Sequence, residues 1–545
     1  MSSNASAIDA SGAIEFYTKN NVVFLTGATG FVGLTCLEKI LWSLPQVKKV
    51  YVLIRVSNKS KDLRDRFESD IVQSRVFERL RAKHRTEQAF RDQVVSKIVP
   101  VRGDIEALGR HFATHGNVTT FHEGDKANTQ DLCLGGQGWT SARDEIKVFI
   151  HCAATLDFRW SFERALWMNT YGALAILEIA RTAQNVVSYV HVSTAFVNEA
   201  PTKEPIEERL YDLTMGNALS NGENADIKDP EWILKKLSTM SKEELLTFEQ
   251  EVVLKRYPHT YTSAKSLAEQ LITSRYQQLG FPVAIVRPTA VGPAIQEPAK
   301  GWVQGIQSMV SLGFSCGLGR IQEWLMDENI AADLVPVDWV CKCILAAASN
   351  PATATQPTVP VIYHAATGWR SRTATKLLGS YVLQYWKSVP APKRRVSNDI
   401  RIDMYPTLPD FEKRFRQRYA KELEEERKEI SHNHNTDANG AKPSSKLDKL
   451  MYASTALGPF WTQEWSFEIT NSLQLDKNVP QELHAGLEKG VKWDDYLHWH
   501  NIGIHRYIIG EEDAIDENIK IDYKILSFNR TFDSSGTTPR MQPRL

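Results

Sequence analysis

Tyr261 and Lys265 are the two side chains whose types and spacing most directly suggest catalysis. They stand four residues apart in Tyr261–Lys265 (YTSAK), a segment predicted to be helical, so both lie on one helix face. A phenol titrates near ~10, and a cation within a few ångströms lowers that pKa by roughly one to three units. Tyr261 can then donate a proton to a carbonyl oxygen that gains negative charge. The alternative for such a tyrosine is an ordinary place in the core.

A second hydroxyl group is expected beside this pair. His191–Ala195 (HVSTA) ends a predicted strand and places Ser193 and Thr194 at its carboxyl end. Successive side chains of a strand point to opposite faces, so only one of the two can face the site. We expect Thr194 to bind the same oxygen, with Ser193 as the alternative.

A glycine-rich turn follows the first predicted strand and opens the first helix. In Thr26–Gly33 (TGATGFVG), Gly27 permits a tight turn, Gly30 lets backbone approach a pyrophosphate, and Gly33 allows close helix–sheet packing. The helix N-terminus then presents free N–H groups to the anion. The alternative is a glycine turn without a ligand. The expected cofactor contacts are Thr26, Gly27, Thr29, Gly30, Phe31, Val32 and Gly33.

The end of the second predicted strand indicates which dinucleotide binds. It carries Arg55, and no acidic residue stands between Arg55 and Asp62. A site for NAD normally has Asp or Glu at the end of this strand. A guanidinium suits a 2′-phosphate, so NADPH is predicted. The alternative is a surface arginine that caps the sheet.

Further cofactor contacts are expected where the third and fourth strands end. Asp104 and Ile105 stand in the right place to flank the adenine, and Ala153 and Ala154 are small enough to let the cofactor pass. Lys265 would hold the nicotinamide ribose.

The elements that must position these residues alternate between strand and helix. Apolar runs indicate parallel strands buried on both faces, with helices between them. The predicted fold is α/β, a doubly wound parallel Rossmann sheet with insertions, plus a smaller, mainly helical C-terminal domain. The predicted strands are 21–26, 49–55, 96–102, 147–152, 187–193 and 282–287, and the insertions are 105–145 and 200–257.

Composition shifts predict the domain boundaries. Residues 431–445 are low in complexity and are typical of a flexible linker, while 409–430 form a charged helix. The predicted parts are an N-terminal segment 1–20, a nucleotide-binding domain 21–370, a helical connector 371–430, the linker 431–445, a C-terminal domain 446–532 and a disordered tail 533–545.

Composition also excludes several classes of function. The 545 residues carry 65 Lys and Arg against 65 Asp and Glu, so the basic excess of a nucleic-acid binder is absent. Six cysteines in 545 residues are too few for a disulfide framework. None forms a C-x-x-C pair, and His432 and His434 fall in the linker, so no metal site is predicted. The chain shows neither a secretory signal nor a predicted membrane span, so an intracellular protein is expected, cytoplasmic or peripheral on an organelle membrane.

Two weaker features concern location. Phe411, Phe415 and Tyr419 form an aromatic stripe flanked by basic residues, which can contact a membrane, although packing within the protein is the favoured interpretation. The terminal Pro543-Arg544-Leu545 partly matches a Ser-Lys-Leu peroxisomal signal.

The order of these motifs resembles the extended short-chain dehydrogenase/reductases and, more narrowly, the fatty acyl-CoA reductases. The resemblance spans residues 21–368 and continues in a later unit. Its matching words are TGATGFVG, KVYVLIR, HCAATLDF, HVSTAFVN, YTSAK, Arg287-Pro288-Thr289, VPVD at 335–338, EWSF at 464–467 and WDDY at 493–496.

The resemblance implies NADPH-dependent reduction of a long-chain acyl-CoA to a primary fatty alcohol through an aldehyde, with release of CoA. It implies that Tyr261, Lys265 and Thr194 (or Ser193) are catalytic, and that Pro288 and Thr289 join the cofactor site. Other interpretations remain: an enzyme that stops at the aldehyde or uses a carrier-bound thioester, a reductase of sugar nucleotides or sterols, or a non-catalytic NADPH sensor. The sequence predicts no oligomeric state.

Overall fold

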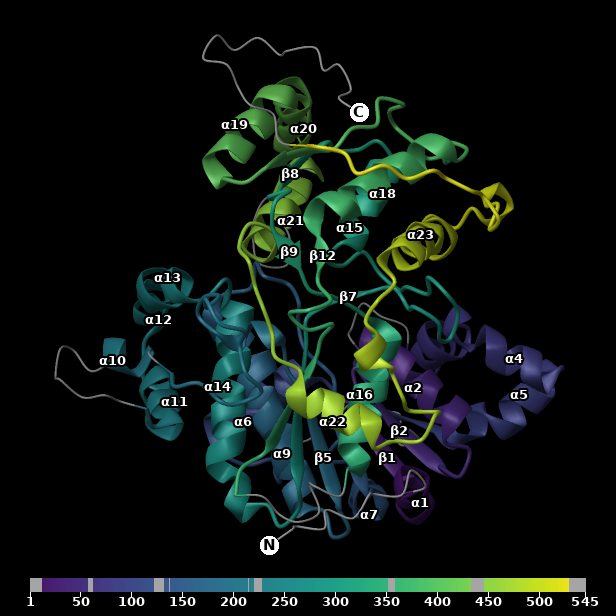
Figure 1. The fold of residues 1–545 in the computed structure, drawn as a ribbon. Helices are drawn as coiled ribbons and strands as arrows, with labels where there is room; N and C mark the ends of the chain where they lie inside the picture. Colours follow the sequence, from purple (N-terminus) through teal and green to yellow (C-terminus); the bar gives the residue numbers. More distant parts are fainter. Residues whose placement is uncertain are drawn as a thin grey trace, which may run out of the picture. The chain divides into compact units, whose positions relative to one another are not determined.

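The chain forms two compact units, each built from separate stretches of sequence (Figure 1). The computed structural model describes residues 12–56, 62–121, 132–136, 138–213, 215–219, 228–350, 358–432 and 446–528. The first unit comprises Met1–Gly305, Asp333–Arg372 and Ser466–Lys492. The second unit comprises Ile306–Ala332, Thr373–Trp465 and Trp493–Leu545.

A parallel sheet forms the centre of the first unit. Among the described residues it has seven strands in the order β11-β6-β5-β4-β1-β2-β3. Their bounds are β1 Val22–Thr26, β2 Lys49–Ile54, β3 Ile98–Arg102, β4 Val148–His151, β5 Ser188–Val192, β6 Val283–Pro288 and β11 Val361–Ala365. The order reverses between β1 and β4, which makes their carboxyl ends the topological switch point where such sheets bind ligands.

The Rossmann prediction is confirmed, since each of the predicted strands is present and parallel to its neighbours. Nearly every residue of β1, β2, β4, β5 and β6 is buried, which explains their unbroken apolar runs. The sequence did not indicate β11, because VIYHA is a short run behind a polar, proline-containing stretch.

Helices flank this sheet (Figure 1). Helix α2 (Phe31–Ser43) packs against α16 (Val337–Ser349), and α6 (Ile105–His115) packs against α9 (Gly172–Thr182). Helix α14 (Thr260–Arg275) carries the Tyr–Lys pair and is buried along most of its length.

The first insertion contains more regular structure than expected, whereas the helical segments expected at 230–237 and 241–254 of the second are present. The stretch predicted as a polar insertion at 105–145 begins with α6, which Asp104 caps. The second insertion holds short helices, of which α11 starts at an Asp229 cap and α12 at a Ser241–Glu244 capping box. Their bounds are α10 Met215–Leu219, α11 Pro230–Ser238, α12 Lys242–Phe248, a π-helix Glu249–Val253 and α13 Leu254–Arg256.

The division of the chain differs from the linear boundaries predicted at 370, 431 and 446. Ser466–Lys492, expected in a C-terminal domain, belongs to the first unit. Its Phe467 bridges Ile206, and the Glu468 N–H donates to the Ile206 carbonyl at 2.8 Å. Partly buried Glu208 accepts hydrogen bonds from Ser472 as well as from the His364 N–H, so this segment supplies part of the hydrogen bonding of its carboxyl group.

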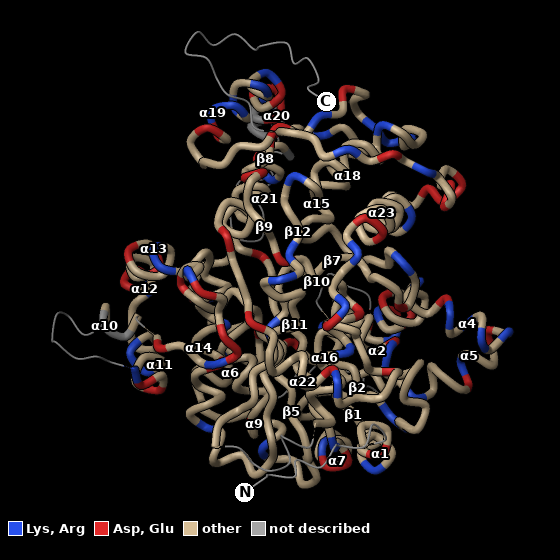
Figure 2. Tube along the Cα trace, in the orientation of Figure 1, with Lys and Arg blue, Asp and Glu red and all other residues tan. Residues whose placement is uncertain are grey.

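The second unit is mainly helical, with short two-stranded pairings. Residues predicted as one charged helix at 409–430 form α19 and α20, which meet at Tyr419. Figure 2 shows both signs of charge on these two helices. The described elements include α15 Val310–Gly317, β8 Glu323–Leu325, β9 Ala331–Ala332, β12 Thr373–Ala374, α18 Thr375–Ser388, β13 Asp403–Tyr405, α19 Leu408–Arg418, α20 Ala420–His432, α21 Lys446–Trp461 and α23 Trp493–Gly503.

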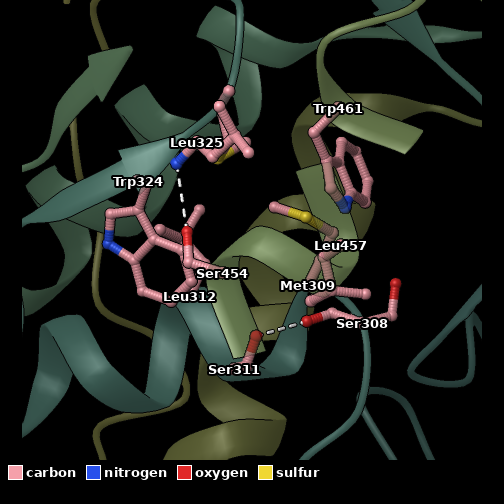
Figure 3. Close-up of a pocket in the computed structure, with 10 residues that line it drawn as sticks. Ser308, Met309, Ser311, Leu312, Trp324, Leu325, Ser454, Leu457 and Trp461 are labelled. Atoms are coloured by element: carbon pink, nitrogen blue, oxygen red, sulfur yellow. Dashed lines mark hydrogen bonds between the residues drawn. The ribbon is translucent and has the colours of Figure 1, made fainter. Parts of the chain in front are cut away.

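A small apolar pocket lies within the second unit (Figure 3). It holds about 210 Å³ of unfilled space between α15, β8 and α21. Ser454 Oγ accepts from the Leu325 N–H at 3.0 Å, and Ser311 Oγ donates to the Ser308 carbonyl at 2.6 Å, so both hydroxyls are engaged. The apolar wall is made by Met309, Leu312, Trp324, Leu457 and Trp461.

The aromatic stripe that could have contacted a membrane is buried in the second unit. Phe411 and Phe415 are fully buried and Tyr419 nearly so, so the aromatic stripe packs within its own unit and offers no apolar face to a membrane. In the described part of the chain, no helix is both long and apolar enough to cross a bilayer. The terminal tripeptide 543–545 and most of the linker lie outside the described residues.

Candidate active site

Thr26 joins the ends of β1 and β4 at the switch point. Its Oγ1 hydrogen-bonds with His151 Nδ1 at 2.8 Å and accepts from the Ala153 N–H at 3.0 Å. Thr26 is fully buried, so its hydroxyl shapes the turn and is not offered to a ligand. Ala153 and Ala154 remain partly exposed, as expected for residues along which a cofactor passes.

The turn needs glycine at two of the three predicted positions. Gly27 has a φ of 75°, and a Cβ there would lie 2.9 Å from the Ala153 nitrogen. A Cβ on Gly33 would lie 2.2 Å from the Gly27 carbonyl oxygen, so Gly33 lets α2 close onto its own turn. This differs from the helix–sheet contact predicted for Gly33. A Cβ on Gly30 would lie 3.3 Å from the Gly27 carbonyl oxygen, which is a close contact but not a clash.

The N-terminus of α2 has the features of an anion site. Gly30 is its N-cap and supplies no side-chain cap, so the first amide groups are left for a ligand. Phe31 begins the helix and Val32 follows, so both contribute backbone N–H groups here. Gln304 Nε2 donates to the Thr29 carbonyl at 3.4 Å and steadies the turn. This backbone therefore fits the pyrophosphate of a dinucleotide.

The residues predicted to contact the adenosine half lie at the strand ends as expected. Arg55 follows β2 and is exposed, so its guanidinium can reach a ligand. Asp104 Oδ1 accepts from the Glu106 N–H at 2.8 Å and so caps α6. Ile105 is buried and its side chain packs close to Gly172. Their contacts with adenine stay predictions.

The Thr194 hydroxyl lies near the Tyr261 phenol and acts to lower its pKa. The ring of Phe158 packs edge-on to Tyr261, with centroids 5.8 Å apart, and stacks on His259 at 4.1 Å. The expected lowering of the tyrosine pKa is wrong for this state of the protein. Burial raises the pKa of the phenol, and the nearby Thr194 hydroxyl only opposes that rise. Tyr261 therefore stays protonated near neutrality, which a proton donor requires.

The structure distinguishes the two candidate hydroxyls. Thr194 acts on the Tyr261 phenol and accepts from the Phe196 N–H at 3.3 Å. The Ser193 hydroxyl is buried and has no hydrogen-bond partner among the described residues. The alternation expected at the strand end thus brings Thr194, and not Ser193, to the tyrosine.

Lys265 lies one turn after Tyr261 on α14 and is 1% exposed. Its ammonium donates to the Val192 carbonyl at 2.8 Å, at the end of β5. Burial lowers the pKa of Lys265 to about 8, with Glu269 and Cys152 acting in the other direction. Buried His151 and His191 stack beside it, and burial with the Lys265 charge lowers the pKa of both rings.

Pro288 ends β6, and Thr289 follows it, on the same edge of the sheet as the hydroxyl pair. Thr289 Oγ1 donates to Asp333 Oδ1 at 2.8 Å. Asp333 also accepts from two backbone amides at 367 and 368, both at 3.0 Å. The sequence reasoning missed Asp333, a buried carboxylate that fixes this strand end.

A second missed feature is the buried ion pair between Glu269 on α14 and Arg287 on β6. Glu269 lies four positions after Lys265, so the same spacing rule that joined Tyr261 to Lys265 could have found it. In the described ranges, no group of three or more His, Cys, Asp or Glu is suited to hold a metal ion. None of the six cysteines forms a disulfide.

Comparisons with known proteins agree with this site. A family profile described as "Male sterility protein" matches residues 25–109 and 114–344, which is more than half of the chain. Fatty acyl-CoA reductase 1 of Arabidopsis thaliana is 27% identical over 496 residues, covering 88% of this chain and 95% of that protein. The alcohol-forming fatty acyl-CoA reductase of Simmondsia chinensis is 27% identical over 365 residues, covering 65% of this chain and 68% of that protein.

A solved structure supports the fold. The terminal R domain of the myxalamid biosynthetic pathway aligns with a TM-score of 0.51 at 17% identity and covers 90% of this chain and 91% of that domain. At that identity the likeness concerns the fold alone. The profile, the curated relatives and the switch-point site together show that the chain belongs to the male sterility protein family of fatty acyl-CoA reductases, and that it is an oxidoreductase with a site for a nicotinamide cofactor.

Proposed function

We propose that this protein reduces a long-chain fatty acyl-CoA to the primary fatty alcohol, with NADPH as reductant and an aldehyde as intermediate. The observation that carries the proposal is the Tyr261 phenol with the Thr194 hydroxyl near it and buried Lys265 one helical turn away. Together they supply two hydroxyls and one cation for a single oxygen, which is what reduction of a thioester carbonyl requires.

The chain's own residues act on the carbonyl oxygen. The bound nicotinamide supplies the hydride to the carbonyl carbon. Tyr261 and Thr194 bind the oxygen as it gains charge, and Tyr261 donates its proton to it. The resulting thiohemiacetal breaks its carbon–sulfur bond, the sulfur leaves with a proton as CoA, and the aldehyde remains. A second reductant and the same proton donor convert the aldehyde to the alcohol.

Lys265 is proposed to act through its charge. Its ammonium lowers the free energy of the developing alkoxide, and its N–H groups can hold the nicotinamide ribose. It must be protonated to do so. Because its pKa lies at about 8 in this structure, we expect activity to decline as the pH rises through that value.

Arg55 is proposed to select NADPH over NADH by binding the 2′-phosphate. Its exposed position at the end of β2 supports this role. Replacement of Arg55 by Gln should weaken NADPH binding by about tenfold or more and leave NADH binding nearly unchanged. Equal effects on both cofactors would contradict the assignment.

The test is incubation of the purified full-length chain with NADPH and acyl-CoAs of varied length, with products identified by mass. Alcohol, free CoA and two equivalents of consumed NADPH are expected. Aldehyde alone would replace the proposal by an aldehyde-forming reductase. Activity only with a carrier-bound thioester would change the substrate, and no turnover of any acyl thioester would overturn the proposal.

A further inference from the structure

A buried ion pair stands directly behind the candidate catalytic lysine. Glu269 follows Lys265 by one helical turn on α14, and its carboxylate meets Arg287 of β6. Arg287 Nε lies 3.0 Å from Oε1 and Arg287 Nη2 lies 2.6 Å from Oε2, so the pairing is bidentate. Both side chains are 1% exposed.

The arginine is fixed from its other side as well. Arg287 Nη1 donates to the Arg209 carbonyl at 3.0 Å and lies 3.4 Å from His364 Nε2. A guanidinium held at three points cannot follow a moving carboxylate. Glu269 is therefore fixed in orientation as well as buried.

Glu269 is the negative charge that faces Lys265. The titratable groups around the ammonium, taken over the described residues of every element packed against it, are Glu269 and Tyr261 on α14, His151 on β4, Cys152 after it, and His191 on β5. Burial keeps both histidines neutral and raises the pKa of the Cys152 thiol, so these groups carry no charge near neutral pH. A carboxylate is needed there because an isolated buried ammonium sheds its proton.

We propose that Glu269, oriented by Arg287, is a positioning residue that keeps Lys265 protonated while the enzyme works. This inference rests on the proposed function of Lys265. It assigns a role in catalysis to an ion pair that touches neither substrate nor cofactor.

The direction of the effect follows from electrostatics. Burial pulls the pKa of Lys265 down to about 8, and Glu269 is the largest influence that opposes it. Without the carboxylate charge, the ammonium loses its proton at a lower pH. Arg287 acts on the Lys265 pKa in the opposite direction, because its positive charge offsets much of the attraction between the Glu269 carboxylate and the Lys265 ammonium.

The central experiment measures pH profiles of two variants. Glu269→Gln should move the alkaline limb of kcat/KM down by about one pH unit, which lowers activity roughly threefold at pH 7.5 and leaves the acid plateau in place. Arg287→Gln leaves the carboxylate with Lys265 as its cationic neighbour and should move the limb upward. Opposite shifts are a signature that mere loss of a structural ion pair does not produce.

A matched control comes from the same helix. Glu231 pairs with Arg275 of α14 at 2.7 Å, and both side chains are partly exposed. Glu231→Gln removes an ion pair from α14 but should leave the limb where it is. Glu269→Asp keeps the charge and should return the limb most of the way to that of the parent protein. It also provides the test if the Gln variant does not fold.

A second measurement separates this inference from the proposed function. The affinity for NADPH, measured by titration of its fluorescence from pH 6 to 9, also depends on the Lys265 charge and needs no acyl substrate. If no acyl-CoA is reduced but the binding limb shifts in opposite directions in the two variants, the proposed function fails and the inference stands. The inference is overturned if Glu269→Gln leaves the alkaline limbs of kcat/KM and of NADPH binding where they are in the parent protein. It is also overturned if Glu269→Asp shifts these limbs as far as Glu269→Gln does.

Discussion

At the scale of single residues, a tertiary contact decides which of two adjacent hydroxyls belongs to the site. Both Ser193 and Thr194 are buried at the end of β5, and their sequence positions differ by one. Only the position of Thr194 near Tyr261 separates them. Because side chains alternate along a strand, only one of the two hydroxyls can face the site. The sequence does not show which one, because the neighbouring strands set the rotation of β5.

We therefore expect Thr194→Val and Ser193→Ala to differ strongly. Loss of the Thr194 hydroxyl removes a donor from the reacting oxygen and should lower kcat by about a hundredfold. Ser193→Ala should stay within about twofold, because that hydroxyl has no partner in the described part of the chain. Steady-state rates and NADPH affinity for both variants check this. Equal losses would place Ser193 in the site.

At the scale of elements, the turn between β1 and α2 depends on backbone contacts too close for any side chain. Gly33→Ala should displace α2 from the turn, because its Cβ would lie 2.2 Å from the Gly27 carbonyl oxygen. Gly116, at the end of α6, has a φ of 66°, and no atom lies within 4 Å of the position that a Cβ would take there. Gly116→Ala therefore costs only about 1–2 kcal/mol of backbone strain.

The measurement is a cofactor titration together with thermal unfolding. Both variants should unfold at a lower temperature, but only Gly33→Ala should weaken NADPH binding, by more than about tenfold. If Gly116→Ala weakens binding as much as Gly33→Ala does, the turn has no special place in the cofactor site.

The same scale shows how far sequence reasoning reaches. Strands such as β1 and β5 could be predicted because both faces are buried, so their apolar runs are unbroken. Short β11 could not be, since it pairs with β6, which is distant in sequence. Spacing could place Glu269 one turn after Lys265, but it could not show the pairing of Glu269 with Arg287 on β6. The raised pKa of Tyr261 was missed because spacing reports a nearby cation but not the depth of burial.

At the scale of the whole molecule, buried neutral histidines make the fold sensitive to acid. The pKa of His151 and of His364 falls to about 3, and that of His500 to about 4, mainly because burial disfavours the charged ring. An unfolded histidine takes up its proton near ~6.5. Their contribution to stability is therefore complete above that pH and is lost progressively as the pH falls from about 6.5 toward 4.

Urea unfolding at pH values from 8 to 5 tests this. The midpoint should be nearly constant above pH 7 and then fall, because each buried ring contributes up to about 1.4 kcal/mol per pH unit. His500→Gln should make the fall shallower, whereas replacement of exposed His115 by Gln should not. A midpoint that rises with acid would contradict the sign.

The first unit also needs a segment that lies far along the chain. A fragment that ends at residue 370 lacks Ser466–Lys492, whose Ser472 binds Glu208 and whose Phe467 packs on Phe196. We expect this fragment to be insoluble or not to bind NADPH. Co-expression with a peptide of residues 466–492 should restore part of the soluble yield. A stable 1–370 fragment with normal cofactor affinity would show that the segment is dispensable.

The interleaving of the two units sets the order in which the protein can mature during synthesis. The chain leaves the first unit at residue 305, returns at 333, leaves at 372, returns at 466 and leaves at 492. The glycine turn leaves the ribosome early, but the sheet that positions it lacks β11 until residue 365 has emerged, and Glu208 lacks its Ser472 partner for about another hundred residues. A nascent chain thus carries the glycine turn long before it carries a complete first unit.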